Sequence, residues 1–177
     1  MSKIRIKGDT SGYVDLETSA TGSNLSVTGN SVHIPGHTLQ TAFNTAPDNS
    51  LQTMSSTSFA ATNVEVSITP KYSNSKMVIT CNVHVDSSAG TNCTLAIFKD
   101  GTILTPKSPS GSYDGHSYFN RYNEGRLLLM QAVYATDANV GTTNAVNYKL
   151  YVKTHSGDIL LRHDLTCPRI FVQEIAV

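Results

Sequence analysis

The sequence is poor in charged residues and contains no tryptophan. Aspartate, glutamate, lysine and arginine make up 15% of its 177 residues, against roughly 25% in an average soluble domain. The 13 basic and 13 acidic residues cancel, so the chain lacks the positive surface that attracts nucleic acid or anionic lipid. We therefore expect no nucleic-acid partner and no membrane insertion. The neutral charge also removes one barrier to self-association.

Long apolar runs are missing as well. The longest of them, Leu127–Met130, is far shorter than the roughly 20 residues of a membrane-spanning helix. The opening Met1–Arg5 lacks the apolar core of a signal peptide, which predicts assembly in a cytoplasm. The cysteines follow neither a disulfide framework nor a zinc pattern, so we expect small buried thiols at Cys81, Cys93 and Cys167.

No pattern for catalysis or cofactor binding is present in the sequence. It contains no nucleophile elbow, phosphate-binding glycine loop, zinc-protease helix or paired carboxylates, so we expect no enzyme, no catalytic residue and no cofactor. His33 and His37 have a spacing that suits a metal on a helix, but Pro35 and Gly36 lie between them. We expect no metal site, with a metal or anion on a threefold axis at His33 or His84 as the alternative.

What the sequence does contain is an apolar period of two. Apolar and polar residues alternate in Val64–Ile68, Met77–Val85 and Val146–Val152, as they do in strands with one buried face. Asp100-Gly101 predicts a tight hairpin, and Ser156–Asp158 predicts a second one. The fold class that follows is all-β, with an antiparallel β-sandwich or jelly-roll head.

Two further strands are apolar on both faces, one starting at Leu127–Met130 and the other covering Ile170–Val177. A strand of this kind lies either in the centre of a sandwich or against another subunit. The residues that we expect in the core or in a trimer interface are Leu127, Leu129, Phe171, Ile175 and Val177.

One segment has a helical period instead. Apolar residues occur at i, i+3, i+4 and i+7 within Leu39–Ala46, and Pro47 ends the run. This spacing predicts one or two helical turns. Proline and asparagine then cluster in Ala46–Ser50, where we expect a boundary between an N-terminal arm, residues 1–46, and a head, residues 47–177.

The arm consists of short apolar stretches that glycines interrupt. We expect strands at Ile4–Ile6, Gly12–Leu16, Asn24–Val27 and Ser31–Ile34. So few apolar residues cannot form a core alone, whereas three entwined copies or a neighbouring protein could bury them. We therefore predict an attachment arm, held by Ile4, Ile6, Tyr13, Val14 and Leu16.

Two stretches resemble proteins of bacteriophage particles. The opening Lys3–Leu16 resembles the N-terminus of tail-fibre and virion proteins of cyanophages and other aquatic phages. Val64–Ile79 resembles a strand, a "TPK-x-S-x-SK" turn and a second strand that open a β-sandwich head similar to the trimeric jelly rolls of the tumour-necrosis-factor and complement type. Pro70 suits the end of the first strand because it lacks a donor. The resemblance implies a homotrimer in the virion, bound to other virion proteins.

The segment between Leu104 and Arg126 is long for a loop in a compact domain, and such loops are usually functional or disordered. Its aromatic and polar composition suits recognition of a host glycan or protein, although the lack of tryptophan weakens the glycan hypothesis. The alternative is a loop that packs on a neighbouring subunit. The residues concerned are Tyr113, Asp114, His116, Tyr118, Phe119, Asn120, Arg121 and Tyr122.

The function that these observations favour is a structural component of a phage particle. The first hypothesis is a trimeric tail-fibre or adhesin subunit that touches the host. The alternative is a capsid decoration (cement) or head-fibre protein that stabilises the capsid lattice. A polysaccharide depolymerase would need clustered acids, and the acidic residues are scattered. The position on the particle is open at this stage.

Overall fold

The computed structural model describes residues 3–7, 13–17, 35–45, 51–87, 91–104, 114–120, 127–162 and 168–177. The chain divides into two compact units, residues 1–33 and residues 34–177. In the first unit, β1 (Lys3–Lys7) pairs antiparallel with β2 (Tyr13–Glu17). This pairing confirms two of the four strands expected in the arm, and the other two lie outside the described residues.

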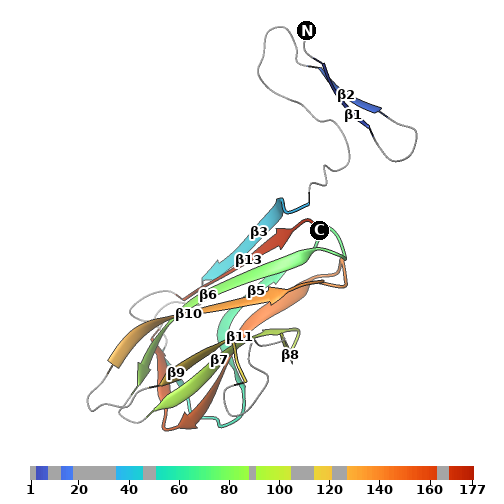
Figure 1. The fold of residues 1–177 in the computed structure, drawn as a ribbon. Helices are drawn as coiled ribbons and strands as arrows, with labels where there is room; N and C mark the ends of the chain where they lie inside the picture. The colour runs from blue at the N-terminus through green and yellow to red at the C-terminus, as the bar shows by residue number, and fades with distance from the viewer. Residues whose placement is uncertain are drawn as a thin grey trace. The chain divides into compact units, whose positions relative to one another are not determined.

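The second unit, the head, contains two antiparallel sheets that enclose one apolar core (Figure 1). The six-stranded sheet contains β3 (Thr38–Thr45), β4 (Leu51–Met54), β6 (Lys76–Ser87), β10 (Leu127–Asp137), β12 (Ile159–Arg162) and β13 (Arg169–Ile175). The five-stranded sheet contains β5 (Ala60–Ile68), β7 (Asn92–Lys99), β8 (Thr102–Ile103), β9 (Ser117–Asn120) and β11 (Val146–Ser156).

The strand pairing identifies the head as a jelly roll. Strands β3 and β13, β5 and β11, β6 and β10, and β7 and β9 form nested antiparallel pairs. A chain that folds into one long hairpin and then winds into two sheets produces this order. The all-β sandwich expected from the period of two is confirmed, as is the tight Asp100-Gly101 hairpin, whose residues have φ of 47° and 81°.

Strand β6 organises the six-stranded sheet. On one side it pairs with β10 along Met77–Ser87. On its other side, β13 pairs with Lys76–Asn82 and β12 with Val85–Ser87, so these two strands lie end to end. The inward side chains of β6 are all buried and meet those of β11 from the opposite sheet: Met77, Ile79, Cys81, Val83, Val85, Val146, Tyr148, Leu150 and Val152.

One polar network crosses this core. The hydroxyl of Tyr148, a fully buried residue, donates to Asp137 Oδ2 at 2.9 Å. Lys99 Nζ lies 2.7 Å from the same oxygen and also donates to Val140 O at 2.6 Å. Burial and the Asp137 carboxylate raise the pKa of Tyr148. The network ties the ends of β7, β10 and β11 together, because each buried polar group has a partner.

Two expectations from the sequence are wrong. Residues 38–45 form strand β3 rather than a helix, because Thr38–Thr45 pairs in register with β13, and tertiary pairing overrides a short helical period. The turn at Ser156–Asp158 does not close a hairpin. Strand β11 belongs to the five-stranded sheet, and β12 crosses to the other sheet and pairs with β4 and β6.

The division of the chain differs from the sequence boundary. The sequence places the boundary at residues 46–47, whereas the compact units divide between His33 and Ile34. The reason is β3, which forms an edge of the six-stranded sheet and thus belongs to the head. Residues 46–50 lie outside the described residues.

Candidate functional site

The outer face of the six-stranded sheet carries a row of aromatic residues. The register aligns Phe43 on β3 with Phe171 on β13, then with Thr80 on β6 and Tyr134 on β10. The side chains of Phe43 and Tyr134 are 68% and 66% exposed, and the rings of Phe43 and Phe171 are 5.9 Å apart. We call these four residues the outer row.

The positions around the outer row are mostly uncharged. Met130 lies four residues before Tyr134 on the same face of β10 and is 62% exposed. The charged residues on this face are Lys76, Arg169 and the Asp86–Arg162 ion pair, whose Nη1 and Oδ2 atoms are 2.9 Å apart. The other residues aligned on this face are Thr38, Thr41, Thr45, Val78, Asn82, His84, Ala132, Thr136, Gln173 and Ile175. Exposed aromatic and methionine side chains with few charges are typical of the centre of a protein interface.

This face contains three of the residues that the sequence assigns to the core or to a trimer interface. Phe171 and Ile175 are half-buried on the outer side of β13, and Val177 is exposed beyond its end. None of the three belongs to the buried core of the head. The other two, Leu127 and Leu129, lie on β10 opposite Ser87 and Val85, where the structure describes only their backbone pairing.

The predicted recognition loop is described over Asp114–Asn120, and here its residues pack on β7. Phe119 is 3% exposed and lies in the core, so its ring is not available to a receptor or to another subunit. Tyr118 packs edge-on against His155 with the ring centroids 5.9 Å apart. Asn120 pairs with Asn92 through the backbone. Tyr113, Arg121 and Tyr122 lie outside the described residues.

His116 has a structural role that the sequence does not reveal. Strands β9 and β8 pair with Asn92–Leu95 and Phe98–Lys99, and leave a gap along the edge of β7. His116 fills this gap: its backbone N–H donates to Leu95 O at 2.9 Å, and its Nδ1 accepts from Ile97 N at 3.2 Å. Burial lowers the pKa of His116, which keeps Nδ1 an acceptor. The backbone and the ring of His116 therefore make the hydrogen bonds that a neighbouring strand would make at this edge.

Asp114 belongs to a cluster over the outer face of the five-stranded sheet. Its carboxylate binds Lys153 Nζ at 2.6 Å, and this hydrogen bond lowers the pKa of Asp114. Lys153 also lies 5.2 Å from the ring centroid of Phe59, a cation–π contact. Phe98 stacks on Tyr151 at 3.9 Å and meets Phe59 edge-on. The cluster covers β7, and within it the Asp114 carboxylate is paired with Lys153 of the same head.

A buried carboxylate fixes the turn that carries the family resemblance. Glu174 on β13 is 0% exposed. Its carboxylate accepts hydrogen bonds from the backbone N–H groups of Lys71 and Tyr72 at 2.8 and 3.2 Å, and from Gln40 Nε2 at 2.6 Å. Burial raises the pKa of Glu174, but these hydrogen bonds outweigh it and the pKa is lowered. Sequence reasoning missed Glu174 because its partners lie about a hundred residues away.

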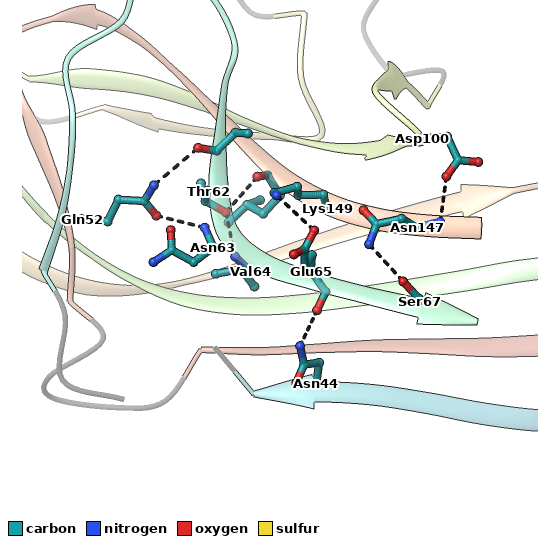
Figure 2. Close-up of polar contacts among 12 residues, drawn as sticks. Asn44, Gln52, Thr62, Asn63, Val64, Glu65, Ser67, Asp100, Asn147 and Lys149 are labelled. Atoms are coloured by element: carbon teal, nitrogen blue, oxygen red, sulfur yellow. Dashed lines mark hydrogen bonds and ion pairs between the residues drawn. The ribbon is translucent and has the colours of Figure 1, made fainter. Parts of the chain in front are cut away.

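Amide side chains close one side of the sandwich, between the two sheets (Figure 2). Asn44 Nδ2 donates to Glu65 O at 2.9 Å, and Gln40 Nε2 donates to Thr69 O at 2.7 Å. Gln52 accepts from Asn63 N at 3.1 Å. These bonds occupy the free edge of β5, which would otherwise invite pairing with another strand. No local sequence pattern marks them.

A polar groove lies beside this closed edge. It has a volume of about 360 Å³ and is lined by Phe43, Asn44, Glu65, Val66, Ser67 and Asn147. Asn147 Nδ2 donates to Ser67 Oγ at 3.2 Å, and Lys149 Nζ lies 3.0 Å from Glu65 Oε2. Figure 2 marks both contacts.

The remaining candidates concern metals, thiols and membranes. Within the described ranges, no three His, Cys, Asp or Glu side chains gather to hold a metal, and no helix could cross a membrane. His33 lies outside those ranges. Cys81 and Cys93 are free and buried, as expected, and burial raises the pKa of each thiol to about 12. Cys167 is not among the described residues.

The predicted attachment residues lie on the hairpin of the first unit. Ile4 pairs with Leu16 and Ile6 with Val14, while Tyr13 pairs with Lys7. The structure describes these residues through their backbone pairing. It brings all five attachment residues onto two adjacent strands.

The comparisons with known proteins give likenesses to solved structures but none to sequences. No protein-family model matches the sequence, and no curated protein sequence matches it. The chain is similar to a chain in the structure of infectious bursal disease virus, Gx strain, with 14% sequence identity and a TM-score of 0.39. The match covers 97% of this chain and 44% of the viral chain, so this chain spans less than half the length of that neighbour.

Proposed function

We propose that this chain is a structural subunit of a bacteriophage particle, of the tail-fibre or adhesin type, that acts by binding rather than by catalysis. In this proposal the head forms a homotrimer through the outer face of its six-stranded sheet. The first unit attaches the trimer to other virion proteins through Ile4, Ile6, Tyr13, Val14 and Leu16.

The observation that carries the proposal is the outer row. Phe43, Phe171 and Tyr134 form one aligned aromatic strip on a face with few charges. A monomer that exposed this strip to water would gain by covering it, at about 25 cal/mol per Å² of apolar surface. A second copy of the same face supplies a cover of matching chemistry, and the zero net charge sets no barrier. The number three rests on the resemblance of Val64–Ile79 to trimeric heads.

Deleting residues 1–33 tests the attachment role. We expect the remaining chain to fold and to keep its oligomeric mass, because residues 34–177 form a compact unit by themselves. Particles assembled with this shortened chain should lack it, as measured by quantitative mass spectrometry of purified particles. If the shortened chain enters particles at the level of the full chain, attachment resides in the head and the lattice-binding alternative gains support.

A further inference from the structure

We propose that the groove between β3 and the five-stranded sheet binds a neutral sugar residue. The inference rests on the proposed function for its biological setting, a ligand on the host surface, while binding itself is a property of a single head. The site differs from the aromatic loop that the sequence singles out. It lies at the β5 edge of the sheet, whereas Asp114 and Tyr118 lie over β7 and its other edge.

The groove has the size of a small-molecule site. Its volume of about 360 Å³ falls within the range of about 300–1,000 Å³ that is usual for such sites. Its polar groups converge from three strands, with Asn44 on β3, Glu65 and Ser67 on β5, and Asn147 on β11. The strand register places Ser67 directly opposite Asn147 (Figure 2).

Each of these polar side chains uses one hydrogen-bonding group on a neighbouring residue and has a second group left to bind a ligand. Asn44 uses its NH₂ group on Glu65 O, so its amide oxygen is the group left to accept. Ser67 Oγ accepts from Asn147, so its hydroxyl hydrogen can donate. Adjacent hydroxyls of a sugar both donate and accept, and amide, hydroxyl and carboxylate groups satisfy both roles. Because these side chains are already held in place, ligand binding costs little of their conformational entropy.

The lining of the groove is mostly polar. Phe43 is among the lining residues, but its ring lies on the outer face of the six-stranded sheet, against Phe171. The groove therefore suits a ligand that binds through hydrogen bonds, and this separates it from the apolar outer row.

The charges favour a neutral sugar over an acidic one. Among the described residues that line the groove, the acidic one is Glu65, and Lys149 pairs with it at 3.0 Å, so the pair is neutral. A uronic acid would bring a second carboxylate next to Glu65, and like charges in proximity repel. Three grooves on one trimer would raise the affinity for a repetitive glycan about 100-fold or more over a single groove.

The experiment titrates the full chain with glucose, galactose, mannose, N-acetylglucosamine and glucuronic acid, and follows amide shifts by NMR. We expect at least one neutral sugar to shift the amides of Ser67 and Asn147, and glucuronic acid to bind more weakly. Asn147→Ala should lower that affinity about tenfold, the effect of one lost hydrogen bond. Asn144→Ala, an exposed amide outside the groove, should leave it unchanged. Ser67→Ala gives a second, smaller change that tests the same contact.

Two results would overturn the inference: no neutral sugar shifts the groove amides, or Asn147→Ala binds as the Asn144→Ala control does. The oligomeric mass of the same samples separates this failure from that of the proposed function. A trimer that binds no sugar overturns the groove alone. A monomer that binds sugar through Asn147 supports the groove and contradicts the proposed trimer.

Discussion

Replacing Tyr134 with glutamate should convert the head from a trimer to a monomer. Tyr134 is exposed in a single head, so the change costs that head little, within about 0.5 kcal/mol. In the proposed trimer the same change buries an unpaired carboxylate in the apolar outer row, which costs several kcal/mol per ion. Light scattering should then give 19.0 kDa in place of three times that mass, about 57 kDa.

The matched control is Asn144→Glu, which adds the same charge at an exposed turn away from this face. It should leave the mass unchanged. A Tyr134→Glu protein that keeps the wild-type mass, with unchanged circular dichroism, would show that the outer row is not the interface. A wild-type protein that is monomeric at micromolar concentration would contradict the trimer itself.

Replacing Glu174 with alanine should lower the free energy of unfolding by about 2–3 kcal/mol. The change removes the buried carboxylate that accepts from the backbone N–H groups of Lys71 and Tyr72 in a partly buried turn, and each unsatisfied buried donor costs about 1–3 kcal/mol. Urea unfolding followed by circular dichroism measures the loss. Glu65→Ala removes a carboxylate of a partly exposed ion pair, so it should cost less than about 1 kcal/mol. Equal effects of the two changes would contradict the anchoring role of Glu174.

The same residue predicts how stability depends on pH. The pKa of Glu174 is lowered in the folded head, so the unfolded chain binds more protons in the interval between the two pKa values. Stability from this group is therefore fully present above the ordinary carboxyl pKa of about 4.3 and is lost as pH falls through the lowered value. Urea titrations above and below that pH should differ less for Glu174→Ala than for the wild type.

Alternation alone was sufficient to predict the fold class. Residues such as Val64 and Ile79 occur every second position because one face of each strand meets the core. The same rule applied to Leu39–Ala46 was ambiguous, since a few apolar residues satisfy a helical period as readily as a strand. Only the pairing of β3 with β13, more than a hundred residues away, decides between them.

The candidate sites were less accessible to sequence reasoning, because they depend on long-range contacts. The aromatic composition of the loop suggested recognition, yet Phe119 packs in the core and His116 completes the edge of β7. Conversely, the sequence did not decide whether Phe171 and Ile175 belong to the core or to an interface, and the strand register places both on the outer face. No sequence pattern marks Asn44 as a contact residue, since its partner is a backbone carbonyl on another strand.

Electron cryomicroscopy of the intact particle would locate the chain and show how its heads are grouped. We expect density for this chain on the particle as groups of three heads, with the outer rows facing a common threefold axis. Location at the tail would support the adhesin hypothesis, and location on the capsid lattice the decoration alternative. Single, separated heads would contradict the trimer, and a particle without this chain would contradict the structural role as a whole.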